Sequence, residues 1–504
     1  MTVAKRIVQA IIIVVLVAAI GLVGYLCYTG ATVGSKVQLV KLSDVQIPEH
    51  LDQDNLFGLF FFDEYGKATP VKDGVDKVCY DPNKPTIIFI HGMQMNYGYN
   101  SVDPFPNPDG VVKAGYNFGV FLWSQLADCG LPGNGKKKIW GRTNGSFFYE
   151  DENGKRVEET EDTLKYSTAE VFVAYWMDFF DKAGCNSPTV TFSGHSLGAN
   201  TLFAVTSYMT TLYKEGLIDK KYLPDRLTYL DAYLDAKEDA DTYVEWLGDT
   251  IGEDGVIGLA RNAVDAAREL GISTEYVKSS QFVSYLSDMI IYGGPGKSRS
   301  LFDKMLYLDY NCDYQPLDPA KHTACMYWIL STIDRKIYDA SGDGNNEFAF
   351  NYNTPVSYSY ARNCVEYNME SNLTESNFDD DVHYSVNVKN AKIAGFAFYD
   401  ENDNGINDDR VKSRAKGVKV ELWCGTEKVD EKITGESGYY EFDIPSAKLG
   451  KTYNIKAVIA HNEVFAKAGD GGYMNNGVNG DGESAKITVN SAIDLKIINI
   501  GIKR

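Results

Sequence analysis

Clustered basic residues are missing from this sequence. Its 49 lysines and arginines stand against 69 aspartates and glutamates, which gives a formal net charge of −20. Neutralising the phosphates of a nucleic acid requires grouped Lys and Arg, so no nucleic-acid partner is expected. The eight cysteines include no CxxC pair, so a zinc site is not expected either. No segment recurs at a fixed period, which excludes repeat folds.

Charge is also missing from residues 7–35. The apolar stretch Ile7 to Cys27 has about the ~20 residues that a helix needs to cross a bilayer. Lys5 and Arg6 precede it, which places the N-terminus in the cytoplasm by the positive-inside rule. We therefore expect residues 1–28 to be a retained, single-pass anchor in the cell membrane, with a cleaved signal peptide as the alternative. Either interpretation places the rest of the chain outside the cytoplasm.

The 504 residues are too many for one ordinary domain. After a stalk at 29–54, short apolar runs alternate with longer helical patterns, which predicts an α/β domain with a mostly parallel sheet flanked by helices at 55–335. Residues 336–390 are rich in Asn, Tyr, Ser and Asp and are interpreted as an extension or linker. Short alternating strands at 391–504 predict a small all-β, Ig-like sandwich.

A Gly-x-Ser-x-Gly pattern carries the first chemical signal. Ser196 lies between Gly194 and Gly198, after the predicted strand Thr189–Phe192 and before a helix that starts at Ala199. A strand, a sharp turn with a central serine and a helix form a nucleophile elbow, in which the glycines avoid clashes with neighbouring backbone. We therefore predict that Ser196 is a nucleophile.

Histidine is scarce, so the general base can be sought by elimination. Four of the six histidines fall in the stalk, at the end of a buried strand, in the elbow and in the β-sandwich: His50, His91, His195 and His461. In an elbow fold the triad follows the order Ser, Asp, His, and the histidine comes after the last strand. This favours His322, which follows the predicted strand Lys304–Tyr310. His383 in the polar extension remains the alternative.

The acid of a triad should end a strand between the serine and the histidine, where it orients the imidazole. Asp231 directly follows the predicted strand Arg226–Leu230, and Asp235 is its rival. Acyl transfer also needs donors for an oxyanion, and we assign these to the backbone N–H groups of Leu197 and Met93. His91, next to that second donor, is then expected to shape the loop.

These motifs appear in the order found in lipases. They are Phe89-Ile90-His91-Gly92, Asn117-Phe118-Gly119-Val120-Phe121-Leu122-Trp123, Gly194-His195-Ser196-Leu197-Gly198-Ala199, Leu230-Asp231-Ala232 and His322-Thr323-Ala324. Over roughly residues 80–335 the chain resembles the lipase-type α/β-hydrolases, including the pancreatic-lipase-like branch. The resemblance implies hydrolysis of carboxylic esters, an ester or lipid substrate, and no cofactor for catalysis. Ala232 departs from the Leu-Asp-Pro often found there.

A lipid substrate would call for a mobile apolar lid, and residues 282–292 could serve as one. The same stretch could equally be an ordinary packed segment.

The C-terminal region carries a signal of its own. Oxygen-bearing side chains stand at positions 1, 3, 5 and 9 of a loop with glycine at position 6, and a backbone carbonyl is available at position 7: Asp400, Asn402, Asn404, Asp408, Gly405 and Ile406. This spacing is typical of calcium loops, although Val411 replaces the usual glutamate at position 12. Together with the strands around it, the loop resembles the B-type repeat of bacterial surface adhesins related to collagen-adhesin B domains. That resemblance implies a structural calcium ion.

Two other functions remain open at this stage. The adhesin-like region allows a surface adhesin or binding protein with an inactive or secondary hydrolase domain. The same triad could also serve an acyltransferase or a peptidase, since a triad does not choose the leaving group. The sequence does not indicate an oligomeric state.

Overall fold

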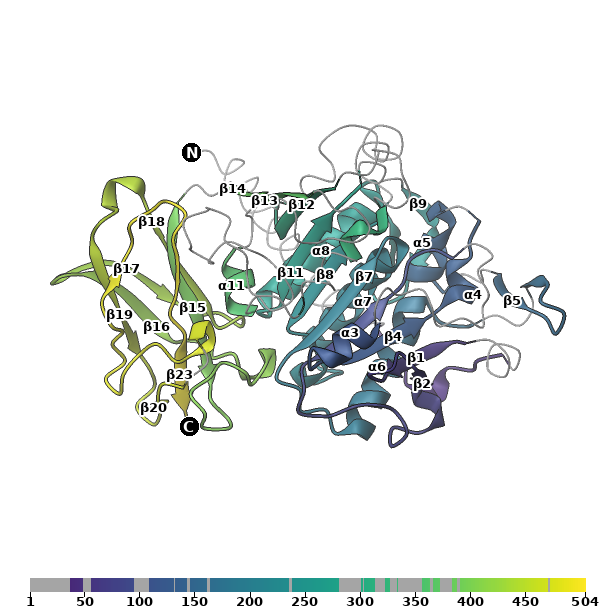
Figure 1. Cartoon of the computed structure of the whole chain (residues 1–504), viewed down its shortest axis with the longest axis horizontal. Helices are drawn as coiled ribbons and strands as arrows, with labels where there is room; N and C mark the ends of the chain where they lie inside the picture. Colours follow the sequence, from purple (N-terminus) through teal and green to yellow (C-terminus); the bar gives the residue numbers. More distant parts are fainter. Residues whose placement is uncertain are drawn as a thin grey trace, which may run out of the picture.

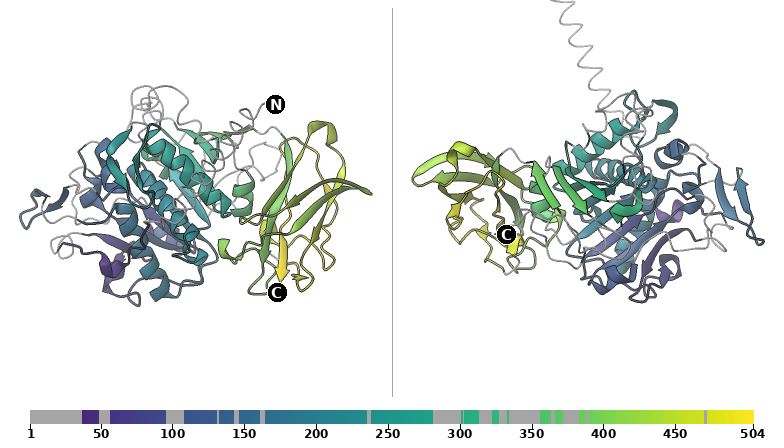
Figure 2. Two further views of the ribbon diagram at one scale, coloured as in Figure 1. Left: turned by 180° about the vertical axis from the view of Figure 1, so that it is seen from behind. Right: turned by 45° about the horizontal axis from the view of Figure 1, so that its top comes forward.

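The computed structural model describes residues 37–48, 56–94, 108–130, 132–142, 146–160, 164–234, 238–280, 301, 303–312, 322–326, 333, 356–362, 366–371, 383–387, 390–469 and 472–504. They form an α/β domain and a C-terminal β-domain that lie side by side (Figures 1 and 2). Among these residues no helix is long and apolar enough to cross a membrane. The predicted anchor at 1–28 and the predicted lid at 282–292 lie outside the described residues.

The α/β domain is built on one large mixed sheet. Its strands follow the order β14-β13-β12-β11-β8-β7-β3-β4-β1-β2. Neighbours from β4 to β13 are parallel, whereas the pairs β1–β2, β1–β4 and β13–β14 are antiparallel. The strands are β1 (Gly58–Phe62), β2 (Ala68–Pro70), β3 (Thr86–Ile90), β4 (Asn117–Leu122), β7 (Val190–His195), β8 (Arg226–Leu230), β11 (Ser273–Lys278), β12 (Leu306–Cys312), β13 (Glu366–Ser371) and β14 (His383–Asn387). This topology confirms the predicted α/β-hydrolase-like fold.

Both faces of the sheet are buried, which explains the continuous apolar runs of its strands. Ile88 and Ile90 of β3 join one buried cluster with helices α6 (Thr168–Ala183), α7 (Leu197–Lys214) and α8 (Gly255–Glu269). The alternate residues Ile87 and Phe89 join a second cluster on the other face. That face is covered by helix α3 (Pro108–Lys113) and by the helical residues 322–326. Ser196 stands between β7 and α7, so the sheet and its helices together fix its position.

Shorter elements connect the main strands and helices. Two helices precede an antiparallel pair of strands, and a second antiparallel pair follows β8. They are α4 (Ser124–Ala127), α5 (Pro132–Trp140), β5 (Phe147–Glu150), β6 (Arg156–Glu159), β9 (Asp239–Val244) and β10 (Asp249–Ile251). The described residues also form short 3-10 helices: η1 (Leu42–Asp44), η2 (Val71–Asp73), η3 (Lys220–Tyr222), η6 (Val411–Ser413), η7 (Ser446–Lys448) and η8 (Gly472–Met474).

The interpretation of residues 336–390 as an extension or linker needs correction. This region contributes helix α11 (Val356–Ala361) and the strands β13 and β14. The two strands extend the large sheet by one parallel and one antiparallel partner. The polar composition follows from their place at the end of the sheet, where a strand need not be apolar on both faces.

Part of the predicted stalk also packs against the α/β domain. The hydroxyl of Tyr208 on α7 donates to the carbonyl of Gln38 at 2.6 Å and accepts from the N–H of Val40 at 3.1 Å. Val37, Val40 and Val45 are buried in the same cluster as α6 and α7. Residues 37–48 therefore belong to the folded domain.

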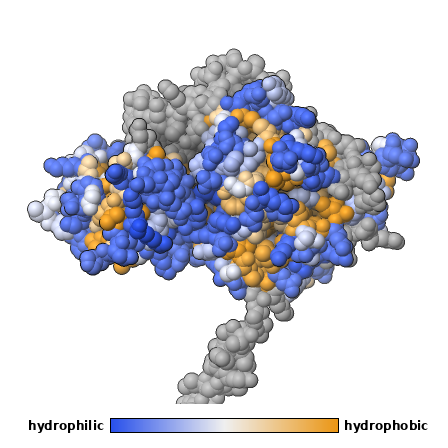
Figure 3. Space-filling view, turned by 90° about the horizontal axis from the view of Figure 1, so that it is seen from below, coloured by the Kyte–Doolittle hydropathy of each residue, from blue (hydrophilic) through white to orange (hydrophobic). Residues whose placement is uncertain are grey.

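The C-terminal region forms two β-sheets around one core, as predicted for a sandwich. One sheet contains β18, β15, β23 and β20, with β22 also paired to β15; the other contains β17, β16, β19 and β21. The strands are β15 (Ala391–Tyr399), β16 (Lys419–Cys424), β17 (Glu427–Ile433), β18 (Tyr439–Ile444), β19 (Thr452–Val458), β20 (Val464–Phe465), β21 (Ile487–Thr488), β22 (Leu495–Ile497) and β23 (Ile500–Lys503). Hydrophilic residues cover much of the face drawn in Figure 3, and apolar patches interrupt them on both domains.

Candidate active site

The turn between β7 and α7 holds Ser196 in a conformation that few non-glycine residues adopt. Its φ is 57° and its ψ is −119°, and its N–H donates to the carbonyl of Leu230 at 2.9 Å. A Cβ on Gly194 would lie 2.5 Å from the carbonyl oxygen of Gly198. A Cβ on Gly198 would collide with the carbonyl of Ile90. Both glycines are therefore required by the close approach of backbone, as expected for a nucleophile elbow.

His322 and Asp231 lie together at the carboxyl ends of the strands. His322 Nδ1 is 2.6 Å from Asp231 Oδ2. The side chain of Asp231 is 1% exposed and that of His322 is 22% exposed. Asp231 itself has a φ of 42°, and its N–H donates to Val277 on β11 at 2.7 Å. This buried carboxylate can orient the imidazole and stabilise an imidazolium.

The His322 imidazole also lies next to the elbow. Its ring centroid is 4.6 Å from that of His195, the residue directly before Ser196. Among the described residues no hydrogen bond joins Ser196 to His322. Hydrogen bonds between a nucleophile and its base are often longer before a substrate binds. The structure thus brings Ser196, His322 and Asp231 into one place.

The two predicted oxyanion donors also border this site. Leu197 is the first residue of α7, where a backbone N–H has no acceptor within the helix. Gly92 lies against the serine on the other side, since a Cβ there would be 3.0 Å from Ser196 Cβ. Met93 follows Gly92 directly, so its N–H belongs to the loop beside the nucleophile.

His91 is fully buried and hydrogen-bonded as a structural residue. Its Nε2 accepts from the backbone N–H of Trp123 at 3.0 Å, so its Nδ1 carries the proton and donates to the carbonyl of Gly92 at 2.8 Å. The indole of Trp123 donates in turn to the His91 carbonyl at 2.9 Å. Burial lowers the pKa of His91 to about 4. The ring is neutral at pH 7 and fixes the start of the loop.

Two serines missed by the sequence analysis complete the surroundings of the acid. Ser280 donates to Asp231 Oδ2 from its hydroxyl at 2.5 Å and from its N–H at 3.2 Å. Ser279 donates from its hydroxyl to the carbonyl of His322 at 3.4 Å. Both residues directly follow β11, at the sheet edge where sites of α/β folds collect. Their position directly after a predicted strand was the one signal in the sequence that could have identified these serines as site residues.

Of the two alternative triad residues, His383 and Asp235, the structure describes only His383. His383 is the first residue of β14 at one end of the sheet, and its backbone pairs with Glu370. Asp235, the rival of Asp231, lies outside the described residues.

The predicted calcium loop is closed by its own hydrogen bonds. Asp400 accepts from the N–H groups of Asn404 and Gly405 at 3.2 and 2.9 Å. The side-chain amides of Asn402 and Asn404 donate to the two oxygens of Asp408 at 3.1 and 2.7 Å. The side-chain oxygens of Asn402 and Asn404 accept instead from the backbone N–H groups of Asn404 and Ile406, at 3.1 and 2.7 Å. A set of carboxylate and amide side chains offers the oxygen ligands that a hard cation prefers. No cluster of three or more His, Cys, Asp or Glu suited to a metal occurs in the described part of the chain.

Asp409, at the end of this loop, lies among several acidic side chains. Burial and the nearby charges of Asp408, Glu401 and Asp400 raise the pKa of Asp409 to about 6. Burial is the largest cause of this shift, and the neighbouring carboxylates of the loop add to it. The carbonyl of Ile406, the fifth predicted ligand, accepts from the N–H of Asp408 at 2.9 Å. A carbonyl has two lone pairs, so this one is still available to a cation.

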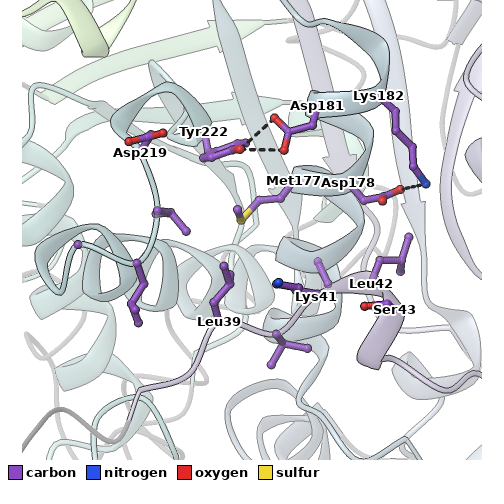
Figure 4. Close-up of a pocket in the computed structure, with 15 residues that line it drawn as sticks. Leu39, Lys41, Leu42, Ser43, Met177, Asp178, Asp181, Lys182, Asp219 and Tyr222 are labelled. Carbon is purple, nitrogen blue, oxygen red and sulfur yellow. Dashed lines mark hydrogen bonds and ion pairs between the residues drawn. The ribbon is translucent and has the colours of Figure 1, made fainter.

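A cavity of about 680 Å³ lies elsewhere on the α/β domain (Figure 4). Leu39 and Leu42 line one side of it, and Met177 of α6 lines another. It also reaches Gly216, just beyond the C-terminal end of α7. Ser196 lies at the other end of this 18-residue helix, roughly 27 Å away at 1.5 Å per residue. This cavity is therefore separate from the candidate active site.

Comparisons with known proteins give weak likenesses. No family model and no curated protein matches the chain. Among solved structures, a C6-C4 SN3 inhibited esterase B from Lactobacillus rhamnosis matches at 12% identity with a TM-score of 0.27, over 62% of this chain and 94% of that chain. A monoacylglycerol lipase from Paleococcus ferrophilus matches at 13% identity with a TM-score of 0.26, over 49% of this chain and 96% of that chain.

The Bacillus anthracis TIE protein matches at 13% identity with a TM-score of 0.15. That match covers 28% of this chain and spans only 20% of the TIE protein. The fold assignment rests on the strand order and the elbow of this chain rather than on these likenesses.

Proposed function

We propose that this protein is a serine hydrolase that cleaves carboxylic esters through Ser196, His322 and Asp231. One observation carries the proposal: the serine of a strained strand-to-helix turn directly follows His195, whose ring contacts the ring of His322, and His322 is hydrogen-bonded to a buried aspartate. Such a constellation activates a hydroxyl that would otherwise be a weak nucleophile. Its geometry supports acyl transfer, and esters are the acyl donors that the lipase resemblance implies.

In the first step, Ser196 Oγ attacks the ester carbonyl carbon while His322 Nε2 accepts the hydroxyl proton. Asp231 stabilises the imidazolium through Nδ1. The carbonyl oxygen becomes an oxyanion, which the N–H groups of Leu197 and Met93 would bind. The tetrahedral intermediate then collapses, the bond to the alcohol breaks, and His322 returns its proton to the leaving alcohol.

In the second step, water replaces the alcohol. His322 removes a proton from the water, the resulting hydroxide attacks the acyl carbon, and the bond to Ser196 breaks. The proton on His322 returns to Ser196 Oγ, and a carboxylic acid leaves. The chain's own residues supply every proton transfer in this scheme.

We also propose that the N-terminal apolar stretch anchors the protein in the cell membrane, with the catalytic domain outside the cytoplasm. The absence of charge over residues 7–35 supports this proposal. In the C-terminal loop, Asp400, Asn402, Asn404, Asp408 and the carbonyl of Ile406 would hold a calcium ion. Such an ion would stabilise the loop and would take no part in the chemistry.

The proposal is tested by comparing wild type with Ser196→Ala on p-nitrophenyl esters of increasing acyl length. Wild type should hydrolyse one or more of them, and Ser196→Ala should lose that activity while its circular dichroism spectrum is unchanged. Retained activity in Ser196→Ala would contradict the assignment. A fluorophosphonate probe should label wild type at Ser196, and absence of labelling would favour a surface binding protein. Parallel His322→Ala and His383→Ala variants identify the base.

A further inference from the structure

His195 lies between the loop that contains Gly92 and the first of the helical residues 322–326. Its ring packs against the ring of His322, with an interplanar angle of 44°. On the other side, a Cβ on Gly92 would lie 3.3 Å from His195 Nδ1. The residue before the serine therefore contacts both the loop that precedes Met93 and the residue assigned as base.

A hydrogen bond ties this ring to the backbone of the base. His195 Nε2 is 2.9 Å from the carbonyl oxygen of His322. A carbonyl only accepts, so Nε2 must carry the proton and donate it. Two further groups donate to the same carbonyl over longer distances, the hydroxyl of Ser279 at 3.4 Å and the thiol of Cys325 at 3.5 Å. Of these three side-chain contacts to the carbonyl, the one from His195 is the shortest.

The surroundings keep His195 neutral. The residue is 6% exposed. Burial, and then the charge of the neighbouring His322, lowers the pKa of His195 well below its usual value. His195 can therefore donate from Nε2 as a neutral ring, without placing a second positive charge beside the imidazolium of His322.

We propose that His195 is a positioning residue, which holds His322 in register with the elbow by hydrogen bonding to the His322 backbone carbonyl. The proposal rests on the proposed function of Ser196 and His322. His195 and Ser196 are adjacent in the chain, so this bond connects the side chain of the residue before the nucleophile to the backbone of the base. Any tilt of the helical residues 322–326 would displace His322 Nε2 from the serine.

The test removes the N–H donor of His195 while keeping a side chain of similar size. His195→Phe removes the N–H donor and retains an aromatic ring, whereas His195→Gln retains a side-chain N–H donor. His195→Leu is a second donor-free variant in case the phenyl ring prevents folding. His461→Phe is the matched control, because His461 is exposed on the C-terminal domain. Each variant is measured for kcat and KM on a short-chain p-nitrophenyl ester.

We expect kcat of His195→Phe and His195→Leu to fall about 100-fold, the size of effect that a misplacement of about 1 Å produces, with KM nearly unchanged. His195→Gln should recover a large part of this loss, and the control should equal wild type. A purely space-filling role predicts the opposite order, with Phe better than Gln. That order, or an unchanged kcat in both donor-free variants, would overturn the proposal.

A second readout does not depend on catalysis. The proton shared by His322 Nδ1 and Asp231 should give a low-field proton resonance, which Asp231→Asn identifies by its loss. In His195→Phe this resonance should broaden or shift because the imidazole is held less firmly, and in His195→Gln it should persist. An unaltered resonance in His195→Phe would contradict the positioning role. If Ser196 takes no fluorophosphonate label in wild type, the proposed function fails, and the resonance still decides the role of His195.

Discussion

Arg410 of the C-terminal domain forms a buried ion pair with Asp225 of the α/β domain, with 2.9 Å between Arg410 Nε and Asp225 Oδ2. The two side chains are 5% and 3% exposed. Arg410 also donates to the backbone carbonyls of Lys221 and Leu223, and Asp225 accepts from the N–H of Val190. The pair therefore ties the C-terminal domain to the amino-terminal ends of β7 and β8, the two strands that lead to Ser196 and Asp231.

We predict that Arg410→Ala strongly destabilises the α/β domain. Removing one partner leaves Asp225 charged and buried, which costs roughly 3–5 kcal/mol. Val411, the next residue, is buried in the same cluster as α6 and α7, so loosening this contact should expose part of that core. The free energy of unfolding is measured by urea titration followed by circular dichroism.

Lys416→Ala is the control for this prediction. Lys416 forms an ion pair with Glu436 on the surface, where the two side chains are 66% and 52% exposed. Exposed pairs contribute little to stability, so this variant should unfold like wild type. If Arg410→Ala and Lys416→Ala unfold at the same urea concentration, the C-terminal domain does not stabilise its neighbour.

We predict that the buried His91 makes the protein less stable in acid. Its pKa is about 4 in the folded protein, below the usual value of 6.5. The unfolded chain therefore binds a proton more readily, and His91 contributes full stability above about pH 6.5 and loses it as the pH falls towards 4. At 1.36 kcal/mol per pKa unit the change is about 3 kcal/mol. His91→Gln should be less stable at pH 7, but its unfolding free energy should fall less steeply between pH 6.5 and 4.5.

The exposed His461 serves as the comparison here too. His461→Gln should keep the pH dependence of wild type. An equally steep loss of stability in His91→Gln would show that other groups cause the acid sensitivity.

The core of the fold could be predicted because its strands are buried on both faces. Strand β8 begins and ends at the residues expected from the sequence, since Arg226–Leu230 is a short run with clear boundaries. The elbow could be predicted because its glycines are required by contacts within one turn.

Features that depend on distant contacts could not be predicted. Strands β13 and β14 lie at one end of the sheet, and their polar sequences carry no apolar run. The contact of Ser280 with Asp231 joins residues 49 positions apart, and that of Arg410 with Asp225 joins residues 185 positions apart. Nothing local in the sequence marks such pairs. The role of His195 was hidden for the same reason, because its partner is 127 positions away.

Calcium should stabilise the C-terminal domain if the Asp/Asn-rich loop binds it. A ligand at about 100 times its Kd raises the free energy of unfolding by about 2.7 kcal/mol. We therefore expect the melting temperature of wild type to rise on calcium addition, and this rise to disappear in Asp408→Ala. Asp430→Asn, which changes an acid on the exposed strand β17, should respond like wild type. A calcium response that survives in Asp408→Ala would place the ion elsewhere, and no response in wild type would exclude this site.

Ser280 offers the sharpest test of the acid. Its hydroxyl and N–H, like His322 Nδ1, bind Oδ2 of Asp231, while no described residue donates to Oδ1. Hydrogen bonds to charged groups contribute about 1.5–3 kcal/mol, so Ser280→Ala should lower kcat about tenfold or more. KM should change little, because the serine acts through Asp231. Ser280→Thr, which keeps the hydroxyl, should recover part of the loss, and Ser446→Ala at an exposed position should have no effect. If kcat of Ser280→Ala equals that of wild type, the carboxylate is held in place without this hydroxyl.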